Sequence, residues 1–179
     1  MIRPGFFVGL GSNLDPERNV PAVVDHLLGH FEGLWISPVV RTAPLGIDTV
    51  HPFLNAVLFV ETDQAEGEVK AFFNEVEEAL GRDRSDRDRD RRDRPADLDI
   101  LMHHRPGDMI GDEAVPTEPY LRPAFIDLCR TMAVAVDATH ATEAAAGLAT
   151  TALTVDETPF GTASRRLSGE PAPARDGTP

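Results

Sequence analysis

An α+β fold, in which an antiparallel sheet carries amphipathic helices, is the fold class that the sequence predicts. Two stretches, 15–31 and 65–80, place apolar residues at helical spacing along one face. Short runs rich in apolar and β-branched residues stand before and after these stretches, as expected of strands. The connections are rich in glycine, proline and charged residues, which favours long loops.

The first part of the chain predicts a strand, a helix and two further strands. Residues 6–11 form a short apolar run that ends in glycine, which is typical of a strand. Asp15 is a suitable N-cap and Pro16 suits the first helical position, so we expect a helix to begin there. The β-branched residues at 35–42 predict the second strand, and the run FLNAVLFVET at 53–62 predicts the third.

A second helix, a charged loop and a fourth strand follow. The helix is expected to end at Gly81, since glycine favours the position after a helix. The segment 82–94 holds seven arginines and five aspartates and has no apolar residue, so we expect a solvated loop. Residues 97–102 (DLDILM) predict the fourth strand, and 103–123, with two adjacent histidines, reads mostly as loop.

The remaining residues predict a third helix and a tail. Residues 124–136 are compatible with a helix, and from residue 161 the composition predicts a mobile tail, so that 1–160 form a single domain. The order strand, helix, strand, strand, helix, strand is that of a ferredoxin-like fold. We therefore expect two helices packed on one face of an antiparallel sheet.

Composition narrows the class of protein. The net charge of −13 argues against nonspecific binding of nucleic acid or an anionic membrane. No run approaches the ~20 apolar residues that cross a bilayer, and the N-terminus lacks the pattern of a secretory signal, so we expect a cytoplasmic protein. The single cysteine, Cys129, lies among apolar residues and is expected to be a buried thiol. We expect the chain to act as a monomer.

Two aspartates on the fourth strand are the strongest candidates for chemistry. Side chains alternate along a strand, so Asp97 and Asp99 share one face while Leu98 and Ile100 point to the core. Two carboxylates about 7 Å apart along a strand suit Mg²⁺, which proteins hold with one or two carboxylates plus substrate phosphates. A half-exposed strand with two solvated acids is the alternative interpretation. The preceding arginine-rich segment favours a phosphate-binding site.

Five blocks of sequence resemble those of one family, the 6-hydroxymethyl-7,8-dihydropterin pyrophosphokinases of folate biosynthesis. They come in the family's order and near its spacing, over roughly the first 130 residues. The blocks are GLGSN at 9–13, RTAPLG at 41–46, PFLNA at 52–56, EEALGRDR at 77–84 and RPADLDIL at 94–101. The resemblance implies a ferredoxin-like fold and an enzyme that moves pyrophosphate from ATP to the hydroxymethyl group of the pterin, giving AMP.

The same resemblance implies a set of site residues. Asp97 and Asp99 would ligate two Mg²⁺ ions that bridge the phosphates of ATP, the co-substrate. For the pterin it implies backbone groups of Thr42, Ala43 and Leu45, the amide of Asn55, support from Asn13, and a ring sandwich by Phe53 and Phe125. For the nucleotide and its phosphates it implies Asn74, Glu77, Ile100, Arg82, Arg84, Arg94 and Arg122.

Several of these residues also have plain structural interpretations. Phe53 and Phe125 could be ordinary core, and Asn13 and Asn55 could cap turns. Glu77 could face solvent from its helix. A buried amide inside an apolar strand, as at Asn55, nevertheless needs hydrogen-bond partners.

The sequence also departs from the family's pattern. The arginine-rich segment lacks the family's usual tryptophan, and the only tryptophan, Trp35, lies elsewhere. Thr117 stands where the family commonly has a histidine that contacts ATP. We therefore expect Arg87, Arg89 and Arg91 to supply phosphate-binding charge. A diverged paralogue that acts on a related pterin, or an inactive pterin- or nucleotide-binding protein, are the competing hypotheses.

Overall fold

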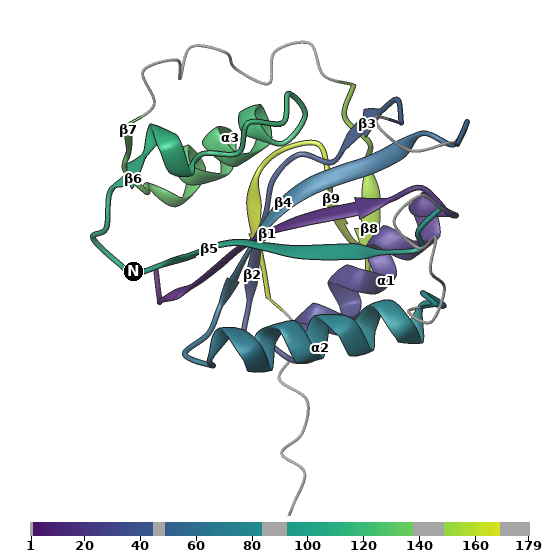
Figure 1. The fold of residues 1–179 in the computed structure, drawn as a ribbon, viewed down its shortest axis with the longest axis horizontal. Coiled ribbons are helices and arrows are strands. Elements are labelled where there is room, and N and C mark those ends of the chain that lie inside the picture. Colours follow the sequence, from purple (N-terminus) through teal and green to yellow (C-terminus); the bar gives the residue numbers. More distant parts are fainter. Residues whose placement is uncertain (1, 45–48, 84–92, 138–148, 169–179) are drawn as a thin grey trace, which may run out of the picture.

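The computed structural model describes residues 2–44, 49–83, 93–137 and 149–168. Its main element is a six-stranded antiparallel sheet (Figure 1). In spatial order the strands are β10 (Arg165–Leu167), β2 (Leu34–Ile36), β4 (Phe53–Glu61), β1 (Gly5–Ser12) and β5 (Asp97–His104), and β3 (Val40–Thr42) pairs with the start of β4. The central order β2, β4, β1, β5 is that of the ferredoxin-like fold, so the predicted fold class is confirmed.

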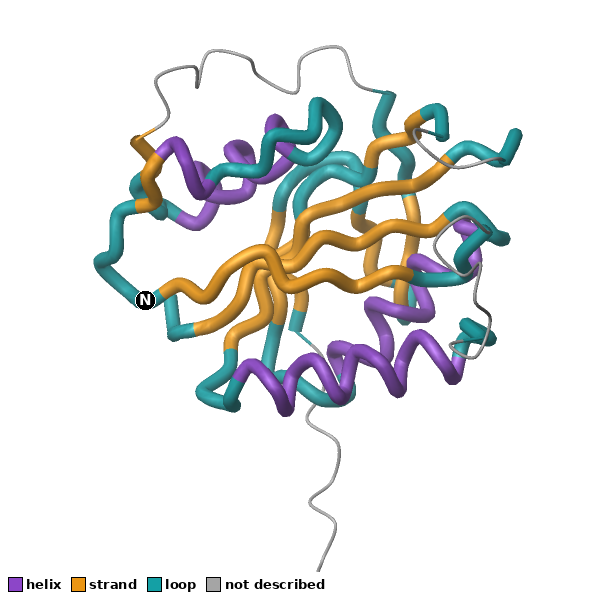
Figure 2. Tube along the Cα trace, in the orientation of Figure 1, coloured by secondary structure: helices purple, strands orange, loops and turns teal. Residues whose placement is uncertain are grey.

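Within the described residues, three helices cover the two faces of this sheet unequally (Figures 1 and 2). On one face lie α1 (Pro16–Leu28) and α2 (Glu66–Ala79), whose apolar stripes pack against every second residue of β1, including Val8 and Leu10. On the opposite face α3 (Arg122–Met132) packs over Phe7 and Phe59. The expectation of two helices on one face is therefore confirmed for α1 and α2, and α3 covers the other face. The alternation of side chains along β1 gives the sheet two separate apolar surfaces to bury.

The predicted second strand is two strands in the structure. Between β2 and β3, Pro38 has no N–H to give to a ladder, and Val39 turns away from β4. Its N–H donates to the carbonyl of Gly161 (2.8 Å), and its own carbonyl accepts from Thr151 N–H (2.8 Å). The break thus brings distant parts of the C-terminal region against the sheet.

The C-terminal region contains strands that the sequence analysis did not predict. β8 (Leu153–Val155) and β9 (Thr158–Phe160) form a hairpin, and β10 pairs with β2. The sheet therefore extends past the predicted domain end at residue 160, and the expectation of a mobile tail is wrong for β10. Short alternating strands with polar outer faces carry too weak a pattern to stand out from a polar tail.

Element boundaries differ from the predictions in other places. The adjacent histidines, expected in a loop, continue β5, and His104 is buried beside Phe7 and Phe59. Burial lowers the pKa of His104. Asp15 stands at the N-cap position of α1, but its backbone is left-handed (φ 43°) and its side chain makes no capping bond. The helix relies instead on Pro16 in its first turn.

The remaining elements between β5 and the C-terminal hairpin are short. β6 (Ile110–Gly111) pairs in parallel with β7 (Val136–Asp137), and a 3₁₀ turn, η2, covers Asp112–Ala114. Cys129 is buried in α3, as expected, and burial raises the pKa of its thiol to about 12. None of the helices within the described residues has the length and apolar character that crossing a bilayer requires.

Candidate active site

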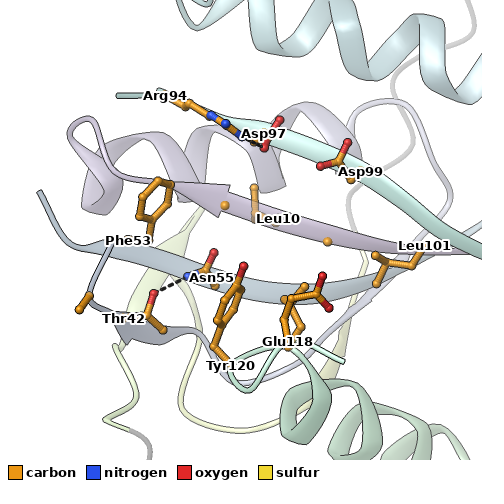
Figure 3. A pocket seen from close by; sticks show the side chains of 14 residues that line it. Leu10, Thr42, Phe53, Asn55, Arg94, Asp97, Asp99, Leu101, Glu118 and Tyr120 are labelled. Atoms are coloured by element: carbon orange, nitrogen blue, oxygen red, sulfur yellow. Dashed lines mark hydrogen bonds and ion pairs between the residues drawn. The ribbon is translucent and has the colours of Figure 1, made fainter. Parts of the chain in front are cut away.

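A pocket of about 300 Å³ lies on the face of the sheet that carries α3. Its floor is β1, where Gly9 and Gly11 leave the sheet surface free of side chains. Figure 3 shows polar side chains on both sides of this floor. The lining comprises Asp97, Asp99, Leu101 and Arg94 on the β5 side, Thr42, Ala43, Phe53 and Asn55 on the β3–β4 side, and Glu118, Tyr120 and Leu121 before α3.

The register of the strands explains this arrangement. Gly11 lies opposite Asp97 on one side and Asn55 on the other, and Gly9 lies opposite Asp99. A Cβ at Gly11 would lie 3.1 Å from Asn55 Oδ1, which is tighter than ordinary contact. Glycine at this position therefore keeps the amide of Asn55 accessible from the pocket.

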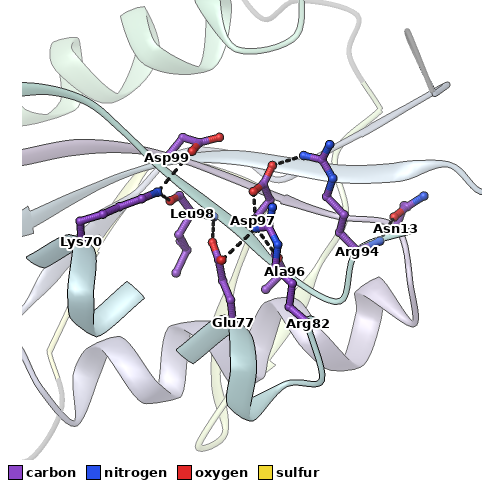
Figure 4. Close-up of polar contacts among 9 residues, drawn as sticks. All are labelled: Asn13, Lys70, Glu77, Arg82, Arg94, Ala96, Asp97, Leu98 and Asp99. Atoms are coloured by element: carbon purple, nitrogen blue, oxygen red, sulfur yellow. Dashed lines mark hydrogen bonds and ion pairs between the residues drawn. The ribbon is translucent and has the colours of Figure 1, made fainter. Parts of the chain in front are cut away.

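Both carboxylate oxygens of Asp97 are held by arginines (Figure 4). Arg82 Nη1 donates to Asp97 Oδ1 at 2.5 Å, and Arg94 Nη1 pairs with Asp97 Oδ2. Burial by itself raises the pKa of Asp97, but the two guanidinium groups outweigh this effect and the net pKa lies below the usual range. Asp97 is therefore ionised at neutral pH and is available as an anionic ligand.

Asp99 is the more accessible of the two carboxylates. Its side chain is 66% exposed, and Lys70 Nζ lies 3.4 Å from Asp99 Oδ1. The same ammonium group donates to the carbonyl of Leu98 at 2.8 Å. Because Asp97 and Asp99 face the same pocket, the donor set matches what Mg²⁺ takes from a protein when phosphates supply its other ligands. Within the described residues no group of three or more His, Cys, Asp or Glu side chains could hold a metal alone.

Glu77 neither lies at the pocket nor faces solvent, which were the two expectations for it. Its side chain is fully buried between α2 and β5. Glu77 Oε1 accepts from Leu98 N–H at 2.7 Å, and Oε2 pairs with Arg82 Nη1 at 2.9 Å. Arg82 is thus shared by Glu77 and Asp97 (Figure 4). Glu77 acts on the pocket through Arg82 and the β5 backbone.

Asn13 does not line the pocket either, but it contacts Arg94, which does. Its amide oxygen accepts from Arg94 N–H and its amide nitrogen donates to Asp93 Oδ1, each at 2.7 Å. Asp93 in turn accepts from Thr49 Oγ1 (2.5 Å) and lies 2.5 Å from His51 Nδ1. The Asp93 carboxylate therefore joins the end of β1 to the segments that precede β4 and β5, and the latter segment carries Arg94.

This carboxylate gives a pH-dependent prediction. Burial raises the pKa of Asp93, but the hydrogen bonds from Thr49, His51 and Asn13 outweigh it, so the pKa lies below its ordinary value of 3.8. The stabilisation is therefore complete above that value and is lost as the pH falls through the lower folded-state pKa. We expect Asp93→Asn to reduce the free energy of unfolding on the order of 1 kcal/mol at neutral pH.

The measurement is denaturant unfolding of both proteins at neutral pH and at about pH 2.5. The difference between them should shrink as the pH falls below 3.8, because wild-type Asp93 is then progressively protonated. A difference that stayed constant with pH would show that the charge of Asp93 contributes nothing.

The residues expected around the pterin are partly brought together. Thr42, Ala43, Phe53 and Asn55 line the pocket, and Asn55 Nδ2 donates to Thr42 Oγ1 at 2.8 Å (Figure 3). Leu45 lies outside the described residues. Phe125 is not brought into the pocket. Its side chain is fully buried on the inner face of α3, and its ring centroid lies 4.7 Å from that of Phe7.

Most residues expected at the nucleotide do not line this pocket. Ile100 lies on the opposite face of β5 and packs against the core beneath α1 and α2. Arg122 pairs with Asp112 at 2.6 Å, and Asn74 is half-buried on α2. Arg84 lies outside the described residues, as do the three arginines at 87, 89 and 91. Arg82 and Arg94 are the expected arginines that reach Asp97.

Some residues in the pocket or beside it were not predicted. Leu101 shares the face of Asp97 and Asp99, so strand alternation could have identified it. Lys70 is the only lysine of the chain, but nothing in the sequence placed it beside Asp99. Glu118 and Tyr120 stand in a turn whose conformation has no clear sequence pattern.

Comparison with known proteins identifies the family of the chain. The sequence model of the family described as 7,8-dihydro-6-hydroxymethylpterin-pyrophosphokinase (HPPK) matches residues 7–147, which include every pocket residue named above. Two relatives from strains of Porphyromonas gingivalis are named 2-amino-4-hydroxy-6-hydroxymethyldihydropteridine pyrophosphokinase. Each is 31% identical over 99 residues, covering 54% of this chain and 67% of the relative. The resemblance seen in the five sequence blocks is thereby confirmed, and the chain belongs to the HPPK family.

Proposed function

We propose that this chain carries out its family's reaction with Asp97 and Asp99 as the ligands of two Mg²⁺ ions. The reaction transfers pyrophosphate from ATP to the hydroxymethyl group of 6-hydroxymethyl-7,8-dihydropterin in folate biosynthesis. The hydroxymethyl oxygen forms a bond to the β-phosphorus and releases its proton to water, the bond from that phosphorus to the α-phosphate oxygen breaks, and AMP leaves with that oxygen. We also propose that the protein works in the cytoplasm on these small molecules alone.

The observation that carries the proposal is the division of one pocket into two chemical sides. The side formed by Asp97, Asp99 and Arg94 is charged, whereas the side formed by Phe53 and Asn55 offers an aromatic ring and an amide. A flat heteroaromatic ring with donors and acceptors along its edge suits the second side. Phosphates and Mg²⁺ suit the first. The two substrates would therefore meet above Gly9 and Gly11.

The chain's own residues would act by positioning and by charge. When bound, Mg²⁺ would neutralise phosphate charge and orient the transferred group. Arg82 and Arg94, which already lie at Asp97, would remain close enough to neutralise charge that develops on the phosphates. Asn55 and Thr42 would hold the pterin, so that its hydroxymethyl group points toward Asp97.

One assay tests the proposal directly. The chain is mixed with 6-hydroxymethyl-7,8-dihydropterin and ATP, with and without Mg²⁺, and AMP and the pyrophosphorylated pterin are followed. We expect both products only with Mg²⁺. Release of AMP with a related pterin alone would favour a diverged paralogue. Binding of either substrate without product would favour an inactive binding protein.

A further prediction concerns the arginine-rich segment. Replacing Arg87, Arg89 and Arg91 together by glutamine should raise the KM for MgATP by roughly tenfold or more, because several charge-assisted contacts to phosphate would be lost. The KM for the pterin should change little. A matched control replaces the exposed Arg18, Arg105 and Arg130 by glutamine, which gives the same change in net charge away from the pocket. An unchanged KM for MgATP in the first variant would contradict the prediction.

A further inference from the structure

We infer that Tyr120, and not Phe125, provides the aromatic ring that faces Phe53 across the pterin subsite. This inference rests on the proposed function, because it assigns a contact to the substrate of the same pocket. It makes Tyr120 a substrate-positioning residue. Tyr120 lies outside the five sequence blocks that resemble the family.

The location of Phe125 argues against a contact with ligand. Its side chain is fully buried and packs against Phe7 in the core beneath α3. Phe7 also contacts Phe59, with ring centroids 4.8 Å apart, so that the three rings form one apolar cluster. Moving Phe125 into the pocket would leave a void in this cluster, which costs free energy in a close-packed core.

Tyr120 is the aromatic residue that the same region presents to the pocket. It lines the pocket together with Phe53 and Asn55, and Figure 3 shows its side chain reaching from the turn before α3 toward β1, beside Asn55. The turn is fixed by its backbone. The N–H groups of Leu121 and Arg122 both donate to the carbonyl of Glu118, at 3.0 and 2.9 Å. The backbone of this turn thus places Tyr120 at the pocket.

The hydroxyl of Tyr120 adds a polar group at the boundary between the two sides of the pocket. Within the described residues it makes no hydrogen bond to the protein, so its donor and acceptor are available to a ligand. Burial raises the pKa of this phenol, and Glu118, Arg94 and Asp97 act on it electrostatically. It therefore remains protonated at neutral pH and lies within electrostatic range of the charged side.

A pterin bound between Phe53 and Tyr120 would use both the ring and the hydroxyl of Tyr120. Its two faces would contact aromatic rings, and the Tyr120 hydroxyl would lie toward the end where the hydroxymethyl group meets the phosphates. Phe53 alone would cover only one face of the ring. The pocket residues opposite Phe53 include no other aromatic side chain among those described.

The test compares three variants of the full chain by titration with 6-hydroxymethyl-7,8-dihydropterin in the absence of ATP. Tyr120→Leu should raise the Kd for the pterin about tenfold, since one stacked aromatic face is lost. Tyr120→Phe keeps the ring and should stay within about threefold of wild type. Phe125→Leu should lower the thermal midpoint and leave the Kd nearly unchanged. The KM for ATP should be unaltered in both Tyr120 variants.

A second measurement uses the wild-type side chain itself. Tyr120 is the only tyrosine of the chain, so incorporation of 3-fluorotyrosine gives a single ¹⁹F resonance. This resonance should shift on pterin titration with the same midpoint as the Kd. An unshifted resonance, or a Kd that rises in Phe125→Leu but not in Tyr120→Leu, would overturn the inference while leaving the proposed function intact. Absence of pterin binding by wild type would overturn both.

Discussion

Asp99→Asn is expected to reduce the rate of AMP formation by roughly a thousandfold and to leave the fold unchanged. The side chain is 66% exposed, and Lys70, with which it pairs, is itself partly exposed, so loss of this contact costs little stability. What the substitution removes is one of the two carboxylates on the pocket face of β5 that we propose as ligands of Mg²⁺. A neutral amide is a much weaker ligand for Mg²⁺ than a carboxylate.

Asp97→Asn should affect stability as well as activity, unlike Asp99→Asn. Asp97 is held by Arg82 and Arg94, so its neutral replacement leaves two partly buried guanidinium groups without their shared anion. We expect a comparable loss of activity together with a clear loss of stability. Asp63→Asn is the matched control, because Asp63 is exposed and lies outside the pocket.

The measurement is initial rates of AMP release over a range of Mg²⁺ concentrations, with denaturant unfolding of each variant. We expect both variants to be folded and excess Mg²⁺ to restore the wild-type rate to neither of them. Loss of a metal ligand would then explain the loss of activity. Near wild-type activity of folded Asp99→Asn would rule out a role for this carboxylate in binding the metal.

Glu77→Ala is expected to lower the free energy of unfolding by about 3–5 kcal/mol. The substitution removes a fully buried carboxylate, and with it the acceptor for Leu98 N–H and one partner of Arg82. The donor and the guanidinium would then be left inside the protein with fewer partners, which is the costly outcome for buried polar groups. Activity should also fall, because Arg82 and the β5 backbone position Asp97.

Glu77→Gln separates charge from hydrogen bonding. The amide oxygen can still accept from Leu98 N–H, so this variant should lose less stability than Glu77→Ala but still lose activity. Glu75→Gln, on the exposed face of the same helix, is the control for loss of one acidic charge. Urea unfolding gives the stability, and the AMP assay gives the activity. Equal stability of Glu77→Ala and Glu75→Gln would contradict a structural role for the Glu77 carboxylate.

The elements that the sequence predicted well are those with strong apolar periodicity. The stripes of α1 and α2 and the runs of β1 and β4 bury one face or both, so the pattern of residues directly reflects the packing. β10 could not be found in this way. Its residues include Arg165 and Arg166, which are exposed, and it depends on pairing with β2, far away in sequence.

The same distinction between strong and weak sequence patterns applies to the residues of the site. Asp97, Asp99 and Asn55 were recognisable because polar residues stood at fixed positions in apolar strands, and the strand register then brought them to one pocket. Glu77 was misplaced because helical periodicity gives the direction of a side chain and not what lies opposite it. Likewise, the number of residues between η2 and α3 did not determine whether Tyr120 or Phe125 faces the pocket.

The position of β5 gives these polar contacts a second importance. β5 is the last strand on its side of the sheet, where unpaired backbone groups can pair with a strand of another molecule. Here Arg82, Glu77 and Lys70 bind the Ala96 carbonyl, the Leu98 N–H and the Leu98 carbonyl in turn. The side chains that organise the aspartates thus also cover the open margin of the sheet. Substitutions that remove these side chains are therefore also expected to free backbone groups at this margin for pairing with another molecule.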